Sequence, residues 1–299
     1  MKNIKFIEGE RCCGAYRSNI QHITHIGTPL LAHRKTYKSM IHNILRSVKL
    51  YVNGLTDLIL PRRCIVCEGK LGLKEKHLCH ECSSDMPLTR FWQLKHNPMA
   101  DKFNDAIQKK LEKEWEKDGR ISCPHERYAY ATALFFYNDD ADYKRIPYSI
   151  KYEGNLSAGK YFGAQIGQEL AKGVWFQDID AIIPVPLHWF RRWKRGYNQA
   201  EVIASGISAA LDRPIRTDIL KRHKYTKTQI LLNITEKASN VSNAFKVNPG
   251  SYEGISHILL VDDVFTTGST LIACFVALRE VFPPSVRISV ATLAFVGGG

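Results

Sequence analysis

The sequence has no long hydrophobic run, and its first 40 residues do not have the pattern expected of a secretory leader. No stretch approaches the roughly 20 apolar residues that a transmembrane helix needs, and the longest apolar patch, residues 129–137, is typical of a strand. The first 40 residues lack the apolar region of a secretory signal peptide. These absences predict a protein that does not insert into a membrane, and we expect it in the cytoplasm.

Acidic residues are few relative to basic ones, and internal repeats and low-complexity tracts are absent. The 299-residue chain has 29 Asp and Glu against 42 Lys and Arg, which leaves a net charge of +13. This excess favours a polyanionic partner or a phosphate-rich ligand but carries no information about fold. The length suggests one large or two modest domains, and 44% hydrophobic residues is an ordinary globular composition.

Half of the eight cysteines lie in two C-x-x-C motifs that are separated by eleven residues. Two such turns can direct four thiolates at one ion, in a closed tetrahedral site without a catalytic position. The alternatives are a redox pair, disulfides or an iron–sulfur cluster, and a cytosolic chain disfavours structural disulfides. We predict a structural Zn2+ in a small module that can unfold while the rest stays folded, with Cys64, Cys67, Cys79 and Cys82 as its ligands.

Composition and periodicity divide the chain into four segments. Residues 1–40 are polar and without periodicity, which predicts a disordered extension. Residues 41–90 combine a helical pattern with the zinc module, and residues 91–127 form a linker with an amphipathic helix that Asp101 would cap. That helix would lie on the main domain through apolar residues spaced by four, namely Phe103, Ile107, Leu111 and Trp115. Residues 128–299 form the main domain.

Strand-like and helix-like stretches alternate from residue 128 onward. Such alternation predicts an α/β domain with a parallel sheet flanked by helices. The expected strands are residues 129–137, 181–185, 257–261 and 287–296. The expected helices are residues 156–172, 198–211 and 269–282.

The most specific motif follows the strand expected at residues 257–261. Asp262 and Asp263 come directly after the apolar run, and Gly268 lies among the hydroxyl residues of 266–270 before a helix. Backbone N–H groups at such a turn, together with the helix N-terminus, can bind a phosphate. The two carboxylates can bind sugar hydroxyls and a magnesium ion. The alternative is a capped turn without a ligand.

The residues at 261–270 resemble the phosphoribosyl-pyrophosphate (PRPP) motif of type I phosphoribosyltransferases. The four-cysteine module and several segments resemble the ComF (competence protein F) family, namely residues 151–154, 180–187, 195–201, 228–229 and 240–245. The resemblance covers about residues 55–296 and implies a type I phosphoribosyltransferase-like sheet. In one departure from the family pattern, Lys237 replaces an Arg, which keeps the charge but loses the bidentate guanidinium.

The resemblance also implies roles for individual residues. Asp262 and Asp263 would be catalytic and would hold the ribose hydroxyls and Mg2+. The PRPP-binding residues would be Val264, Thr266, Thr267, Gly268, Ser269, Thr270, Pro186 and Arg195. A flexible loop over the site would contain Arg222, Thr228, Gln229, Lys237 and Asn240. The loop that follows Val185 would meet the pyrophosphate, with Arg191, Arg192, Lys194 and Arg195 close to it.

Three functions remain open from the sequence. The first is a binding protein with a site for PRPP or a related nucleotide sugar phosphate, which acts in DNA uptake through single-stranded DNA and the uptake machinery. The ComF resemblance implies this function, and the basic charge and the aromatic residues of 189–197 agree with it. The second is an active, magnesium-dependent phosphoribosyltransferase of nucleotide metabolism with an unknown acceptor. The third is a scaffold whose site has decayed, against which the intact acidic pair argues.

Overall fold

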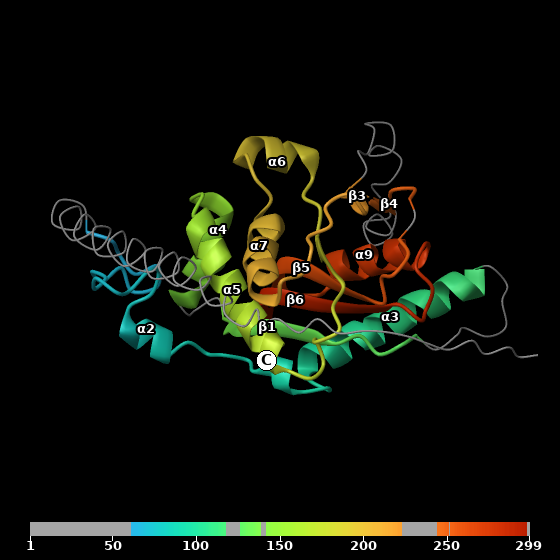
Figure 1. Ribbon diagram of the computed structural model, residues 1–299, viewed down its shortest axis with the longest axis horizontal. Coiled ribbons are helices and arrows are strands. Elements are labelled where there is room, and N and C mark those ends of the chain that lie inside the picture. Colours follow the sequence, from blue (N-terminus) through green and yellow to red (C-terminus); the bar gives the residue numbers. More distant parts are fainter. Residues whose placement is uncertain (1–60, 118–125, 139–141, 223–243, 251, 298–299) are drawn as a thin grey trace, which may run out of the picture. The chain divides into compact units, whose positions relative to one another are not determined.

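A four-stranded parallel sheet forms the centre of the described unit. The structure is a computed structural model that describes residues 61–117, 126–138, 142–222, 244–250 and 252–297 (Figure 1). The sheet has the order β1-β6-β5-β2 and only parallel pairings. Its strands are β1 (Ala131–Tyr137), β2 (Ala181–Pro184), β5 (His257–Phe265) and β6 (Arg287–Val296). The predicted α/β class with a parallel sheet is confirmed.

Helices pack on both faces of this sheet (Figure 1). One face carries α4 (Arg145–Tyr152), α5 (Leu156–Lys172) and α7 (Gln199–Leu211). The other face carries α3 (Pro98–Lys117) and α9 (Ser269–Arg279). Shorter helical segments are α2 (His80–Ser84), η1 (Phe91–Gln93), η2 (Asp142–Lys144) and α6 (Trp189–Arg195). None of the helices in the described ranges has the length and apolarity to cross a bilayer.

A second, two-stranded sheet lies beside the first. It pairs β3 (Leu220–Arg222) with β4 (Phe245–Val247) in the antiparallel sense. The two strands flank residues 223–243, which lie outside the described residues. The predicted disordered extension and the helix expected after residue 40 also lie outside them.

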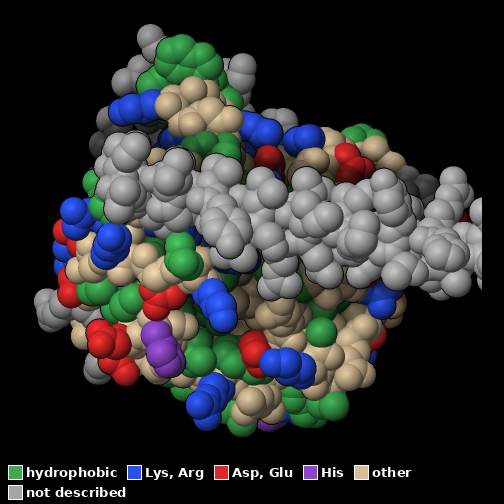
Figure 2. All heavy atoms as spheres, turned by 60° about the vertical axis from the view of Figure 1, so that its left-hand side comes forward, with side chains coloured by type: hydrophobic (Ala, Val, Ile, Leu, Met, Phe, Trp, Pro, Cys, Tyr) green, Lys and Arg blue, Asp and Glu red, His purple; other side chains and the backbone are tan. Residues whose placement is uncertain are grey.

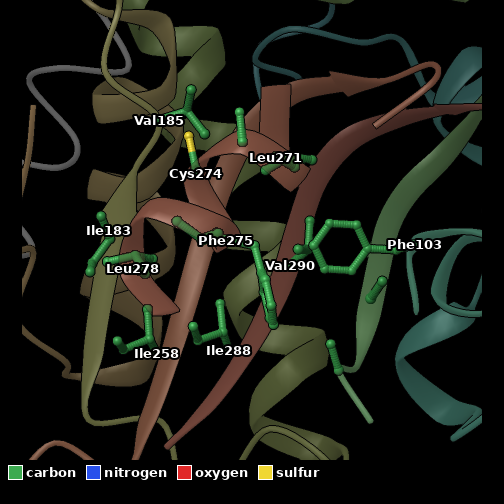
Figure 3. Packing of buried hydrophobic residues seen from close by; sticks show 14 of the residues in the cluster. Phe103, Ile183, Val185, Ile258, Leu271, Cys274, Phe275, Leu278, Ile288 and Val290 are labelled. Atoms are coloured by element: carbon green, nitrogen blue, oxygen red, sulfur yellow. The ribbon is translucent and has the colours of Figure 1, made fainter. Parts of the chain in front are cut away.

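The central strand β5 supplies both halves of the core. Ile258 and Leu260 pack toward α3 and α9, whereas Leu259 and Val261 pack toward α5 and α7. Figure 3 shows the first of these clusters, with Phe275 of α9 among the strand residues. Burial of this apolar surface on both sides holds β5 in place and is the main force that stabilises the sheet.

Helix α3 packs through its apolar stripe, as its periodicity predicts. Phe103 and Ile107 are buried against the sheet domain. Its expected N-cap is wrong, because the side chain of Asn97 accepts the N–H of Ala100 at 2.9 Å. Asp101 instead accepts the hydroxyl hydrogen of Tyr128, at 2.7 Å.

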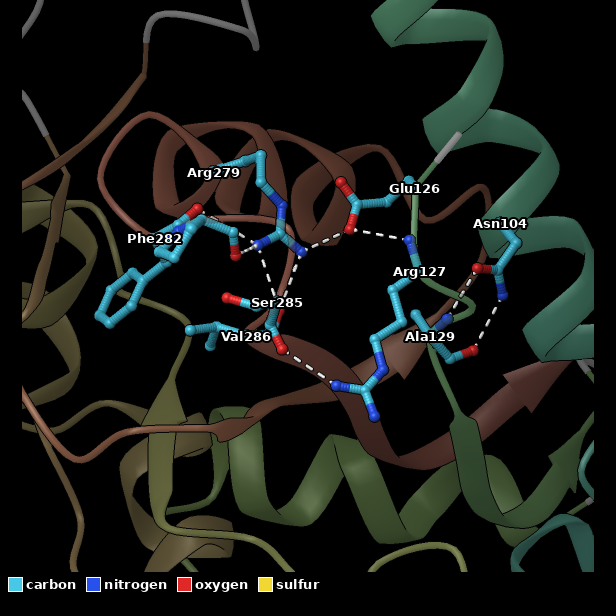
Figure 4. A network of polar contacts seen from close by, with 9 residues as sticks. Asn104, Glu126, Arg127, Ala129, Arg279, Phe282, Ser285 and Val286 are labelled. Atoms are coloured by element: carbon cyan, nitrogen blue, oxygen red, sulfur yellow. Dashed lines mark hydrogen bonds and ion pairs between the residues drawn. The ribbon is translucent and has the colours of Figure 1, made fainter. Parts of the chain in front are cut away.

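A buried ion pair fixes the C-terminal end of α9. Arg279 lies 2.7 Å from Glu126, and both side chains are almost completely buried. The same guanidinium donates to the carbonyl groups of Phe282, Pro283 and Val286 (Figure 4). Because one guanidinium binds a carboxylate and three carbonyl groups at once, its orientation is fixed. These contacts hold α9 and the chain around it in one arrangement.

Candidate functional site

The two acidic residues of the motif lie inside the central strand rather than after it. β5 continues to Phe265 because its last residues pair with β6. The predicted end of this strand at Val261 is therefore wrong. The pairing of β5 with β2, by contrast, ends at Val261. Asp262 and Asp263 thus occupy the carboxyl end of the sheet beside the point where β2 stops, which is where open α/β sheets bind their ligands.

The carboxyl groups of this pair are only partly satisfied. Asp262 accepts the N–H of Asp263 at 2.9 Å, and Asp263 accepts the N–H of Val264 at 2.8 Å with one oxygen. The other oxygen of Asp263, Oδ2, is buried and accepts no hydrogen bond from any described residue. Its ion-pair partner is Lys151, whose Nζ lies 3.4 Å away. A buried carboxylate oxygen in this state favours a ligand that brings hydroxyl groups or a cation.

The pKa of Asp262 also favours a ligand that brings positive charge or hydroxyl groups. Burial is the largest cause that raises the pKa of Asp262, and the charge of Asp263 is the next. Asp262 keeps some accessible surface, but protein atoms surround its carboxyl group closely enough to desolvate it. A cation or a hydroxyl ligand beside Asp262 would favour its ionised form.

The turn after β5 presents hydroxyl groups to solvent. Thr266, Thr267 and Ser269 are exposed, and Thr270 is half-buried. Thr267 and Ser269 bond each other through their hydroxyl oxygens at 2.7 Å. Gly268 precedes α9 with φ of 75° and gives no side-chain cap to the helix. The open N-terminus of an 11-residue helix and these hydroxyls together can accept a phosphate group, as the motif predicts.

Gly268 is required by its conformation and by a ring beneath it. Its φ lies in the left-handed region, and a Cβ atom there would lie 2.7 Å from Cζ of Phe265. The Cβ direction is therefore toward the protein interior and not toward the open side of the turn. A larger side chain at this position would strain the turn rather than fill the space for a ligand.

One residue near the turn has no signal in the sequence. Lys102 of α3 donates to the carbonyl oxygen of Thr266 at 3.0 Å, and its Nζ lies 6.0 Å from the ring centre of Phe265. It adds a positive charge beside the turn. Lys102 is one of many lysines on a polar helix face, and only the tertiary fold brings it to a loop that lies 164 positions away.

A pocket of about 740 Å³ opens between the end of α4 and α6. Basic and aromatic side chains alternate around it. The guanidinium of Arg195 lies 5.1 Å from the ring centre of Tyr152 and donates to the side chain of Gln199 at 3.1 Å. The lining residues are Lys151, Tyr152, Glu153, Gly154, Phe190, Arg191, Lys194, Arg195 and Tyr197. Positive charge and flat rings together suit an anion that carries an aromatic group.

The segment expected as a loop after β2 contains helix α6. The side chain of His188 caps it by accepting the N–H of Phe190, and Gly196 ends it with φ of 79°. Three large aromatic residues stay exposed, with Trp193 at 78% and Trp189 and Phe190 at 51% each. Figure 2 shows hydrophobic side chains beside Lys and Arg at the top of the view, where α6 lies in Figure 1.

The four basic residues that we expected near the pyrophosphate do not all face the same place in the structure. Arg191, Lys194 and Arg195 line the pocket. Arg192 turns to Glu201 and donates to both carboxylate oxygens, at 2.8 and 3.3 Å. An exposed pair of this kind contributes little stability but directs the guanidinium to α7 and not to the pocket.

Two further sets of predicted residues border the site or lie outside the described ranges. The chain leaves the sheet at half-buried Pro186, since Val185 still donates to the carbonyl of Val261 at 2.9 Å. Arg222 ends β3, and its charge, after burial, helps to lower the pKa of His188. The other expected loop residues fall outside the described part of the chain, namely Thr228, Gln229, Lys237 and Asn240.

The four cysteines of the two C-x-x-C motifs meet at one point. Their sulfur atoms lie within 4.8 Å of one another, and Sγ of Cys67 and Cys79 are 3.7 Å apart. Tetrahedral Zn–S bonds of about 2.3 Å place sulfur atoms roughly 3.8 Å apart, so the spacing fits zinc. Although burial opposes ionisation, backbone N–H groups, beginning with that of Cys67, lower the pKa of Cys64 to about 7, whereas burial and the neighbouring sulfur atoms raise the pKa of Cys82. A thiolate is the form that binds zinc.

The backbone builds this site from a hairpin and a helix N-terminus. The N–H of Cys64 donates to the carbonyl of Gly69 at 2.8 Å, which closes the first knuckle. Cys79 caps α2, and its sulfur accepts the N–H of Cys82 at 3.4 Å. His77 is not among the ligands; it is half-buried, and its ring centre lies 5.2 Å from that of Tyr161.

The fold and the two sites define a class: an α/β protein with a parallel sheet and a four-cysteine zinc module. Residues 55–91 match the family model described as a double zinc ribbon domain. This match and the four sulfurs support the predicted structural zinc.

Curated relatives then identify the kind of protein this chain resembles. It is 29% identical over 236 residues to competence protein F of Haemophilus influenzae, which covers 76% of this chain and 94% of that protein. It is 31% identical over 144 residues to competence protein ComFC of Bacillus subtilis, covering 46% of this chain and 53% of that protein. A shorter match is to DNA utilization protein YhgH of Escherichia coli K12. The two are 36% identical over 92 residues, which covers 31% of this chain and 40% of that protein. These relatives confirm the predicted resemblance to the ComF family.

Proposed function

We propose that the chain binds a phosphorylated pentose, PRPP or a related nucleotide sugar phosphate, at the carboxyl end of β5. The observation that carries this proposal is the buried Oδ2 atom of Asp263, which lacks a hydrogen-bond donor among the described residues and lies in the strand that leads into the hydroxyl turn. Sugar hydroxyls would supply the missing donors. The turn at residues 266–270 and the N-terminus of α9 would receive the phosphate.

Magnesium fits the same donor set. Carboxylate oxygens are the ligands that this ion prefers, and Asp262 and Asp263 would hold it through at most a few direct bonds. When bound, the ion neutralises charge on a pyrophosphate group. Pro186 and Arg195 would face that group, with Lys102 adding positive charge beside the turn.

We place this activity in DNA uptake or DNA use, as a binding protein. The printed names of the relatives, competence protein and DNA utilization protein, support this context. The pocket and the exposed rings of α6 suit single-stranded DNA, whose bases stack on aromatic side chains while basic groups meet the backbone. The cytoplasmic location and the domain boundaries inferred from the sequence stay predictions.

Calorimetric titration with PRPP and Mg2+ tests the sugar-phosphate site. We expect Asp263→Asn to weaken binding by about tenfold or more, since a hydrogen bond to a charged group is worth roughly 1.5–3 kcal/mol. Asp105→Asn is the matched control, because Asp105 lies exposed on α3 and pairs with Lys109. Equal affinity of the Asp263 variant and the wild type would remove the acidic pair from the site.

The second candidate is an active phosphoribosyltransferase. The intact acidic pair and turn favour it, since carboxylates beside the sugar would stabilise the cationic character that develops as pyrophosphate leaves. Incubation with PRPP, Mg2+ and candidate acceptors separates the two functions. Release of pyrophosphate that Asp263→Asn abolishes would establish the enzyme. Binding of PRPP without turnover would establish the binding protein.

A further inference from the structure

Lys151 lies between the acidic pair and the aromatic pocket. It belongs to the last turn of α4, and its Nζ is 3.4 Å from Oδ2 of Asp263. The same side chain lines the pocket, and its Nζ is 6.0 Å from the ring centre of Tyr152. The ammonium group of Lys151 can therefore reach both the acidic pair and the pocket.

The contact with Lys151 leaves the carboxylate of Asp263 incompletely satisfied. The two groups are close enough for an ion pair, but Oδ2 accepts no hydrogen bond from any described residue. The side chain of Asp263 is 10% exposed, whereas that of Lys151 is 31% exposed. The lysine can thus leave on the solvent side, while the carboxylate cannot follow. A flexible four-carbon stem allows this movement by rotation of the side chain alone.

Two of the other cations near the pocket have partners, whereas Arg191 and Lys194 line its wall with their charges. Arg192 is bound to Glu201, and Arg195 lies against Tyr152 and bonds Gln199. While Lys151 pairs with Asp263, the carboxylate neutralises much of its field at the pocket. Release of this ammonium group would add a full positive charge to the pocket wall.

We propose that Lys151 couples the two sites. A ligand that takes over Asp263 with its hydroxyl groups or its counter-ion releases Lys151 to the pocket, where the ammonium group strengthens binding of a phosphodiester backbone. By linkage, a strand in the pocket strengthens binding at the acidic pair by the same factor. The inference rests on the proposed function and adds to it that the two ligands bind cooperatively.

The test measures one ligand in the presence of the other. A fluorescent oligothymidylate of about ten nucleotides without a terminal phosphate probes the pocket. It is titrated into the full chain with and without saturating ribose 5-phosphate and Mg2+. For the wild type we expect the sugar phosphate to raise oligonucleotide affinity about fivefold or more, within the usual range of coupling between sites.

Two variants locate the effect. Lys151→Met should bring the dependence on sugar phosphate below about twofold, whereas Lys160→Met, an exposed lysine on neighbouring α5, should keep it. Independent binding of the two ligands to the wild type would overturn the coupling, and unchanged coupling in Lys151→Met would overturn the role of Lys151 in it. Either result would leave the proposed function intact. A wild type that fails to bind ribose 5-phosphate would overturn the sugar-phosphate site and the coupling with it. A wild type that binds ribose 5-phosphate but does not bind the oligonucleotide, with or without the sugar phosphate, would overturn the DNA site and the coupling.

Discussion

Two separate constraints act on Gly268, in the turn after β5. Gly268 needs a positive φ and also has the ring of Phe265 directly beneath it. Gly254 has a similar φ of 79° but nothing within 4 Å of the place where a Cβ atom would lie. The comparison of these two glycines separates backbone strain from contact with the ring. The sequence predicts the need for glycine at 268, but it does not contain the position of the ring.

We expect Gly268→Ala to cost more stability than Gly254→Ala. A residue other than glycine at positive φ costs of order 1–3 kcal/mol, and only Gly268→Ala adds the collision with Phe265. Chemical denaturation of both variants gives the two losses in free energy of unfolding. Equal losses would show that the ring moves aside at no cost.

A second residue, His257, should make stability depend on pH. It is fully buried, with Nδ1 2.7 Å from Asp178 and Nε2 2.8 Å from the hydroxyl of Ser289. Burial lowers its pKa below the ordinary 6.5, although Asp178 acts in the other direction. The unfolded chain therefore binds more protons, and stability falls as the pH drops through the ordinary His range.

The variant His257→Gln keeps a polar side chain but cannot take up this proton. Between about pH 7 and 5 we expect its free energy of unfolding to vary less than that of the wild type. Urea denaturation at several pH values provides the comparison. The same pH slope in both proteins would assign the acid sensitivity to another group.

At the scale of elements, periodicity predicts the long segments and fails at the site. The bounds of α5 and β6 match the prediction, because each has a sustained apolar pattern. The end of β5 does not, since two carboxylates signal a loop although β6 still pairs with that stretch. Helix α6 has seven residues and no buried face, so no periodicity could reveal it. Both of these differences lie at the proposed functional site.

Helix α6 should contribute to DNA binding through its exposed rings. We expect Trp193→Ala to weaken binding of an oligothymidylate by about tenfold, because one stacked base is worth roughly 1–3 kcal/mol. The fold should persist, since this side chain is 78% exposed. Fluorescence anisotropy at several salt concentrations measures the effect. Leu73→Ala, an exposed apolar residue of the zinc module, is the control, and equal affinities of the two variants would remove α6 from the interface.

At the scale of the whole molecule, the zinc module shares a core with the sheet domain. Val66, Leu71 and Leu78 belong to the same apolar cluster as Phe162 of α5. Polar contacts add to this, because Tyr143 donates to the carbonyl of Cys82 at 2.8 Å and Arg145 pairs with Glu68. This packing argues against the expectation, made from the sequence, that the main domain survives loss of the metal unchanged. Spacing along a chain cannot show which surface a module packs on.

We expect Cys79→Ser to remove the zinc and to lower the melting temperature of the whole described unit. Loss of a structural zinc site removes folding free energy that the shared core transmits to α4 and α5. Native mass spectrometry should show one zinc per chain in the wild type and none in the variant, and thermal unfolding should show one shifted transition. Cys274→Ser does not touch the metal and should leave zinc content unchanged. An unshifted main transition would show that the module is energetically separate.

The central claim is that the end of β5 and the turn before α9 hold a phosphorylated pentose. The most direct measurement is a crystal structure of the full chain soaked with PRPP and Mg2+. We expect density for the 5′-phosphate against residues 266–270 and for the ribose hydroxyls at Asp262 and Asp263. PRPP bound at another place, or a turn that stays empty at a concentration where calorimetry shows binding, would contradict the account.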